Sequence, residues 1–128
     1  MVFGIMQERR ASPRVKIRFK VGVMLSDGGV HYVWTYDISL GGMQLLSDYN
    51  ADVGAVLRVF FSVLDTQTDA YVRLMARVRV VHSVYDGSER CFRIGVEFVD
   101  FDGDGRAVYN RYLDSRLYSR YGQRLGVG

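Results

Sequence analysis

Two short segments near the start of the chain combine side chains that can bind an anion with side chains that can bind a nucleobase. The first contains Arg10 and Arg14, four residues apart, with Arg9 directly before them. Arginine carries a planar fork of donors that matches both a phosphate and the O6/N7 edge of guanine. The second segment supplies a carboxylate, a hydroxyl and a glycine, at Asp37, Ser39 and Gly42. Together these residue types predict a site for a compact guanine ligand with two anionic groups.

Pro13 determines how the arginines are presented. Proline has no N–H and disfavours helical geometry at Ser12, so we expect residues 10–14 to form an extended or turned segment. In an extended segment the Cα atoms of Arg10 and Arg14 lie roughly 13 Å apart, because each residue of a strand advances the chain by about 3.3 Å. That span suits a ligand with separated anionic and aromatic parts.

The second segment would supply the acceptors that arginine lacks. Asp37 could accept the N1–H and N2–H₂ groups of guanine, and Ser39, two residues later on the same strand, would share its face and offer a hydroxyl. Gly42 would let the backbone approach the ligand closely, or would adopt a positive φ angle. Each motif occurs often by chance, whereas both motifs in this order, separated by one predicted hairpin, are much more specific.

Size and charge indicate one domain with a local basic segment. The chain has 128 residues, enough for a single core. Its 17 lysines and arginines against 14 acidic residues leave a formal charge of +3, a mild excess compared with proteins that coat nucleic acid. Arginines and lysines crowd the first twenty residues, where Glu8 is the sole acid. We therefore divide the chain into an N-terminal arm, residues 1–14, and a folded body, residues 15–128.

Cysteine content and hydropathy indicate a soluble cytoplasmic protein. The single cysteine, Cys91, excludes an internal disulfide and fits a reducing compartment. The apolar opening, residues 1–6, is shorter than the core of a signal peptide, and no apolar run reaches the length of a membrane span. Cys91 would lie beside Arg93, which could lower the pKa of the thiol, although an inert thiol is the safer expectation.

Alternation of apolar and polar residues is the dominant pattern and predicts six strands. They are expected over residues 15–24, 30–37, 43–46, 56–64 and 72–84, with a sixth that has Phe92, Ile94, Val96 and Phe98 on its inner face. Asp-Gly pairs at residues 27–28 and 86–87 predict hairpin turns, since this dipeptide readily supplies positive φ angles. Six strands at this spacing predict a mainly β fold, a six-stranded antiparallel β-barrel.

A change of period after Asp104 predicts a C-terminal helix over residues 105–118 that packs on the barrel or closes one end. The helical spacing is carried by Val108, Tyr112, Leu113, Leu117 and Tyr121. The acidic segment over residues 100–105 imitates the start of a calcium-binding loop, but its twelfth position is Arg111 instead of a glutamate. We therefore expect a plain turn into the helix.

On these motifs the chain resembles the PilZ domain family. The family pattern is Arg-x-x-x-Arg on an N-terminal arm, followed at the barrel rim by Asp or Asn-x-Ser-x-x-Gly, and the matching residues are Arg10, Arg14, Asp37, Ser39 and Gly42. Residues 77–81 and 94–98 and the terminal helix also resemble later parts of the family. The resemblance implies a six-stranded barrel that binds the bacterial second messenger cyclic di-GMP, with the arm wrapping over the ligand.

The same resemblance implies roles for single residues and a mode of signalling. Arg10 and Arg14 would hold phosphates and guanine Hoogsteen edges, and Asp37 and Ser39 would engage a guanine. Gly42 would make room, and Arg9 could stack on a second ligand molecule. We predict a stand-alone, non-catalytic receptor without a cofactor or metal. Its arm would become ordered when loaded, so that an unidentified downstream protein senses the messenger.

The alternatives to this prediction are an enzyme, a barrel that binds single-stranded nucleic acid and a barrel that binds a protein. An enzyme would need a nucleophile, base or metal set, and neither His31 nor His82 has an evident partner in the sequence. A small barrel could instead bind single-stranded nucleic acid by stacking on Tyr32, Trp34 and Tyr36, with Arg73, Arg77 and Arg79 along the backbone. Packing in the core or at the rim explains these aromatic residues more simply. A third possibility is a protein-interaction barrel in which the arginines meet an acidic partner.

Overall fold

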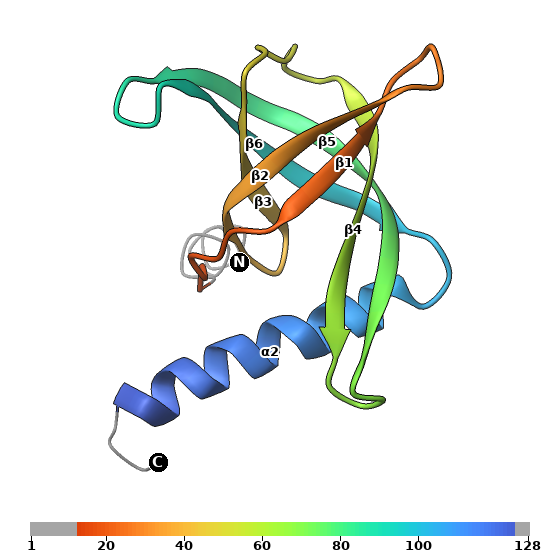
Figure 1. Ribbon diagram of the computed structural model, residues 1–128, viewed down its shortest axis with the longest axis vertical. Helices are drawn as coiled ribbons and strands as arrows, with labels where there is room; N and C mark the ends of the chain where they lie inside the picture. Colours follow the sequence, from red (N-terminus) through yellow and green to blue (C-terminus); the bar gives the residue numbers. More distant parts are fainter. Residues whose placement is uncertain (1–12, 125–128) are drawn as a thin grey trace, which may run out of the picture.

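The computed structural model describes residues 13–124, with side chains to residue 118. In this range six antiparallel strands form a closed barrel in the order β1-β2-β3-β6-β5-β4 (Figure 1). The strands are β1 (Lys20–Met24), β2 (Val30–Ile38), β3 (Gly42–Ser47), β4 (Val56–Asp65), β5 (Ala70–Asp86) and β6 (Cys91–Phe101). Helix α2 (Gly105–Arg124) follows β6 and packs against β4, β5 and β6. The predicted fold class, a six-stranded antiparallel barrel with a C-terminal helix, is confirmed.

The core is built from alternate strand residues and one face of α2. Strand β5 directs Leu74, Ala76, Val78 and Val80 inward, as the period of two predicts. Among its described side chains, helix α2 contributes four buried hydrophobic residues to the core, which are Val108, Tyr109, Tyr112 and Leu113. Tyr109 is fully buried, and its ring meets those of Phe61, Phe98 and Phe101 at centroid distances of 6.1, 4.9 and 5.6 Å. Aromatic packing of this kind fixes the helix on the barrel.

The first strand is shorter than the alternation over residues 15–24 predicts. A bulge in the ladder between β2 and β3 lies at residues 35–37. On the other edge of β2, regular pairing with β1 begins only at Lys20, and the ladder is interrupted over residues 16–19. The Thr35 hydroxyl fills the interruption: it accepts a hydrogen bond from Phe19 N–H at 2.9 Å and donates one to Ile17 O at 2.5 Å. Val15 then forms an isolated bridge with Ile38. The extended course predicted for this segment is retained without its regular hydrogen bonding.

Other boundaries differ from the prediction at turns and at the helix end. The predicted turn at Asp27-Gly28 is present, and Gly28 has a φ of 90°. In the turn after β5 the positive φ falls on Arg90, at 60°, instead of on Gly87, because the turn spans residues 87–90 and Arg90 N–H bonds to Asp86 O. Helix α2 continues to Arg124, six residues past its predicted end at residue 118.

The aromatic residues Tyr32 and Trp34 of β2 lie on the outside of the barrel, so of the two explanations expected for them, packing in the core is wrong. Tyr32 is 53% exposed and Trp34 is 46% exposed. The inward positions of the same strand belong to the buried Val33 and Thr35. Over residues 13–124 no helix combines the length and the apolarity that a membrane span requires.

Candidate functional site

The side chain of Arg14 contacts those of Asp37 and Ser39, which the sequence assigned to the same site. Its Nε donates to Asp37 Oδ1 at 3.0 Å, and its NH2 lies 2.9 Å from the same oxygen. The NH1 group of Arg14 lies 3.5 Å from Ser39 Oγ. The Arg14 side chain is 45% exposed whereas that of Asp37 is 8% exposed, so a buried carboxylate anchors a guanidinium that still faces solvent. Arg9 and Arg10 lie outside the described residues.

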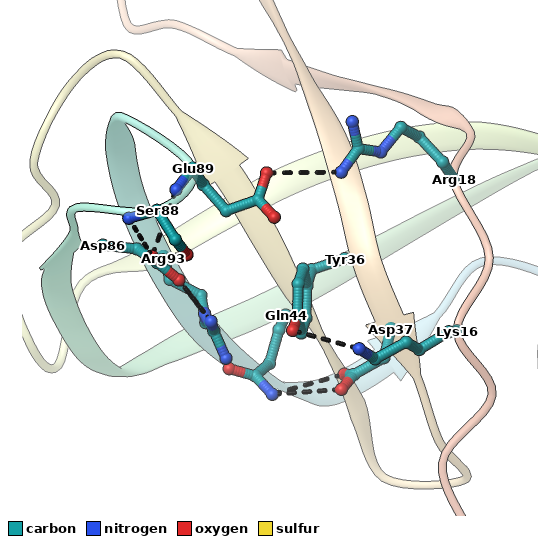
Figure 2. Close-up of polar contacts among 9 residues, drawn as sticks. All are labelled: Lys16, Arg18, Tyr36, Asp37, Gln44, Asp86, Ser88, Glu89 and Arg93. Carbon is teal, nitrogen blue, oxygen red and sulfur yellow. Dashed lines mark hydrogen bonds and ion pairs between the residues drawn. The ribbon is translucent and has the colours of Figure 1, made fainter.

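The bulge in β2 explains how Asp37 reaches this position. A strict period of two would place Asp37 on the inner face with Val33 and Thr35, but the bulge adds one residue, Tyr36, and Asp37 pairs with Gln44 of β3. Gln44 alternates with the core residues of β3 and therefore faces outward. Its Nε2 donates to Asp37 Oδ2 at 3.1 Å and lies 3.4 Å from Oδ1 (Figure 2).

Ser39 belongs to a tight turn between β2 and β3, and residues of α2 donate hydrogen bonds to this turn. Ser39 N–H donates to Gly42 O at 2.9 Å, and the Ser39 hydroxyl donates to the same oxygen at 3.3 Å. The hydroxyl of the buried Tyr109 donates to Ser39 O at 2.6 Å, and Arg106 NH1 donates to Leu40 O at 2.9 Å. Burial raises the pKa of Tyr109, so its hydroxyl stays protonated and keeps donating.

Gly42 is required by the barrel itself. It does not adopt a positive φ, so that alternative from the sequence is wrong. A Cβ at this position would lie 2.0 Å from Val96 O on the adjacent strand β6, a distance that no real side chain tolerates. The close approach at Gly42 is therefore between two strands, and Gly41 beside it has open space around its own Cβ position.

A cavity of about 550 Å³ adjoins these residues on the outer face of β3, β5 and β6. Its lining includes Arg14, Ser39, Gly42 and Gln44 from one side, and Val81, His82, Gly95 and Glu97 from the other. This volume lies in the range of sites for small ligands. The Arg14 guanidinium, the Ser39 hydroxyl and the Gln44 carboxamide in this lining can bind a polar, anionic molecule. The carboxylate of Glu97 also lines the cavity and is paired with Arg79 at 3.2 Å.

Two further cations, Lys16 and Arg93, lie near Asp37, Gln44 and Tyr36 (Figure 2). The Arg93 guanidinium lies 4.0 Å from the centroid of the Tyr36 ring, and Lys16 Nζ lies 4.8 Å from it and 3.2 Å from the Tyr36 hydroxyl. Arg93 is bound by Asp86, whose pKa is lowered by hydrogen bonds from Ser88, from Arg93 and from the Glu89 N–H. The Asp86 carboxylate therefore stays charged and keeps Arg93 in place over Tyr36.

Several residues that shape the site were not predicted from the sequence, although the sequence pattern marks two of them, Gln44 and Tyr109. Gln44 is the one polar residue among the apolar positions 43–46 of the short third strand. Tyr109 is three residues before Tyr112 and therefore shares its helical face. Arg93 is visible in the sequence only as a neighbour of Cys91. Its stacking on Tyr36 joins β6 to β2, two strands that lie on either side of β3, and alternation within one strand does not predict such a contact.

The other residues that the sequence singled out have structural partners. Asp100 and Asp102 of the calcium-like segment pair with Arg77 and Arg58, and Gly105 begins α2, as the predicted turn requires. Arg93 does not lower the pKa of Cys91: burial and then the charges of Glu89, Asp48 and Asp86 raise it, which agrees with the inert thiol expected from the sequence. Of the arginines considered for nucleic acid, Arg77 pairs with Asp100 and Arg79 with Glu97, at 3.2 Å in the second case.

Comparison with known proteins identifies the family. The model of the PilZ domain matches residues 8–115, so this chain belongs to the PilZ domain family. No curated protein matches the sequence.

Three solved structures share the fold. The Bacillus subtilis inhibitor of motility MotI/DgrA has a TM-score of 0.70 and 17% identity, covering 88% of this chain and 53% of that one. Escherichia coli YcgR in complex with c-di-GMP has a TM-score of 0.66 and 16% identity, covering 94% and 51%. The MrkH–c-di-GMP complex of K. pneumoniae has a TM-score of 0.58 and 21% identity, covering 88% and 55%. This chain therefore spans about half the length of these relatives.

Proposed function

We propose that this PilZ domain is a non-catalytic receptor for cyclic di-GMP that binds the messenger beside Arg14, Asp37 and Ser39. The observation that carries the proposal is the contact of Arg14 with Asp37 and Ser39, which lie 23 and 25 positions later in the sequence, next to the cavity of about 550 Å³. Support also comes from two relatives of the same fold, YcgR and MrkH, whose structures contain c-di-GMP.

Each side chain has a role in this proposal that follows from its hydrogen bonds. Arg14, held by Asp37 Oδ1, would donate to a phosphate or to the Hoogsteen edge of guanine. Asp37 Oδ2 accepts from Gln44, and a carboxylate oxygen has a second lone pair, so Oδ2 could also accept from guanine N1–H or N2–H₂. The Ser39 hydroxyl would be a second polar contact. Arg10 would bind a phosphate, and Arg9 would stack on a second ligand molecule.

In the signalling step, ligand binding would order the N-terminal arm that precedes Arg14. The surface that an unidentified partner protein meets would change, and a partner that prefers the loaded form would report the messenger. Hydrogen exchange on residues 7–15 tests this step, because protection there should rise when cyclic di-GMP is added. Unchanged protection at saturation would reject the step and leave the binding site itself untouched.

Calorimetric titration with cyclic di-GMP tests binding and stoichiometry together. We expect micromolar or tighter affinity. Arg14→Ala should weaken binding at least tenfold, because charge-assisted hydrogen bonds each contribute about 1.5–3 kcal/mol. Arg58→Ala is the matched control, since Arg58 is a similarly exposed arginine that pairs with Asp102 and does not line the cavity. Absence of heat with the unmodified protein at saturating ligand would refute the proposal.

A further inference from the structure

On the side opposite β3 and β6, the barrel is closed by only two residue pairs among the described residues. Strands β1 and β4 pair through Gly22 with Phe60 and Val23 with Val59. Strand β4 continues to Asp65, but residues 16–19, which precede β1, are not paired with it. A cavity of about 320 Å³ lies at this divergence, lined by residues 17–19 and 62–64 and, from α2, by Tyr112, Ser115 and Arg116. We call this gap between residues 16–19 and residues 62–64 the seam.

The backbone groups of Lys16 and Arg18 face the seam. The odd-numbered residues Val15, Ile17 and Phe19 all direct their main-chain groups at β2: Val15 exchanges bonds with Ile38, and Ile17 O and Phe19 N and O bond to Thr35. In an extended chain successive residues direct their hydrogen-bonding groups to opposite edges. The N–H and C=O groups of Lys16 and Arg18 therefore point away from β2, into the gap.

Strand β4 presents the opposite margin. Because Gly22 faces β4 and is paired with Phe60, the main-chain groups of Phe60 face β1, and alternation gives Ser62 and Leu64 the same direction. Within residues 13–124 none of Lys16, Arg18, Ser62 and Leu64 has a backbone hydrogen bond across the seam. Two unpaired strand margins form a template for an additional extended chain.

A second cavity, of about 290 Å³, continues the seam along the outside of the barrel. Phe19 and Ser62 line both cavities. The second cavity has an aromatic wall: the Phe60 ring lies over Gly22, where a Cβ would come within 2.3 Å of it, and Tyr32 packs on its edge at 6.1 Å between centroids. Glycine at position 22 is thus the residue that lets Phe60 lie flat against the barrel.

Three cations that have no ion pair with another described residue border this groove, whereas Arg18, which also lines it, is paired with Glu89 at 3.5 Å. Lys20 Nζ lies 5.3 Å from the Tyr32 ring centroid and 5.6 Å from that of Trp34, and Arg73 lies 4.7 Å from that of Phe60. Arg116 borders the end of the seam at α2. Among the described residues that line the two cavities, none carries a carboxylate. Lys20, Arg73 and Arg116 can therefore all serve an external anion.

We infer that the seam is a docking site for an extended, acidic segment of a partner protein, which adds as a strand between residues 16–19 and β4. The backbone margins would supply its main-chain hydrogen bonds, and Lys20, Arg73 and Arg116 would bind its carboxylates. This surface is separate from the site around Arg14, Asp37 and Ser39, so the inference does not depend on the cyclic di-GMP proposal. Nucleic acid fits less well, because Lys20 already covers the rings of Tyr32 and Trp34.

Fluorescence anisotropy with defined peptides tests the inference. The probe is a labelled hexapeptide of alternating glutamate and valine; its comparisons are the lysine–valine counterpart, the glutamate–valine peptide with alternate N-methyl groups, and a deca-thymidine. We expect the first probe to bind at least tenfold more tightly than each of the others. Equal binding of the N-methylated peptide would overturn strand addition, and tighter binding of the oligonucleotide would overturn the choice of a protein partner.

Two kinds of variant locate the binding. Arg73→Glu should weaken the acidic peptide at least tenfold, whereas Arg90→Glu, an exposed arginine on the turn after β5, should not change it. Ser62→Pro removes an N–H that faces the seam and leaves the hydrogen bonds between β4 and β5 in place, so it should also weaken binding. If Ser62→Pro does not fold, Lys20→Glu replaces it; unchanged affinity in Arg73→Glu and Lys20→Glu would refute the inference.

Discussion

The hydroxyl of Tyr109 in α2 donates a 2.6 Å hydrogen bond to the main-chain oxygen of Ser39, seventy positions earlier in the chain. This bond links the C-terminal helix to the turn that carries the candidate site. Tyr109→Phe removes the donor, keeps the ring and leaves a buried carbonyl unpaired. Because an unsatisfied buried acceptor costs about 1–3 kcal/mol, the free energy of unfolding should fall by that amount in urea denaturation.

Affinity distinguishes this structural role from general loss of stability. The Ser39 turn should loosen in Tyr109→Phe, so cyclic di-GMP should bind several-fold more weakly even well below the melting temperature. Tyr118→Phe is the control, because Tyr118 lies on the same helix and is 81% exposed. A Tyr109→Phe protein as stable as the unmodified chain would contradict the proposed linkage.

Gly42 and Gly41 form a matched pair for testing why the motif contains glycine. Gly42→Ala places a methyl group against Val96 O and should lower the free energy of unfolding by about 1–3 kcal/mol, the usual cost of overpacking. Gly41→Ala has no atom within 4 Å of the new methyl group and should be nearly neutral. Urea denaturation of both variants gives the comparison, and equal stabilities would show that β3 and β6 can separate locally at little cost.

The strand pattern of this chain could be predicted because each strand has one buried face. Residues 56–64 and 72–84 alternate regularly, and their inward residues are those of the barrel core. A period of two carries no information about an interruption of that period. The bulge at Tyr36 therefore could not be predicted, although it turns Asp37 outward, opposite Gln44.

The site was predictable in its residue types and less so in its geometry. Arg14, Asp37 and Ser39 are brought together in the structure, as expected. The pairing of Arg14 with Asp37, 23 residues later, follows from the hairpin, and the Asp27-Gly28 turn predicts that hairpin. The reason for Gly42 was missed, since strand β6, with Val96, is more than fifty residues away and its approach depends on how the barrel closes.

Arg14 and Asp37 should be coupled in binding cyclic di-GMP. Arg14→Ala and Asp37→Ala should each weaken binding at least tenfold, but the double variant should lose less than the sum of the two single losses, because Asp37 holds the guanidinium in addition to its own contact with guanine. Calorimetric titration of the four proteins gives the coupling free energy. The pair Arg14→Ala with Arg58→Ala should be additive by comparison. Full additivity for Arg14 and Asp37 would mean that Asp37 does not hold Arg14 in its binding position.

Acid should weaken the attachment of α2 through Asp65. Arg111 donates to both oxygens of this carboxylate at 3.2 and 3.1 Å, and the pKa of Asp65 is lowered first by that hydrogen bond and then by Gln67 N–H. A group whose pKa is lower in the folded state contributes stability above its unfolded pKa of about 3.9, and loses it as the pH falls toward the folded value. Asp65→Asn should therefore be less stable than the unmodified protein at pH 7, and the difference should shrink below about pH 4.

Urea denaturation at pH 7, 4 and 3 measures this difference. Asp114→Asn provides the control, because Asp114 is an exposed carboxylate on the same helix. Its stability should follow that of the unmodified protein at every pH, since no described cation pairs with it. A gap between Asp65→Asn and the unmodified protein that stays constant from pH 7 to pH 3 would show that the Asp65–Arg111 pair does not hold α2 against β4 through its charge.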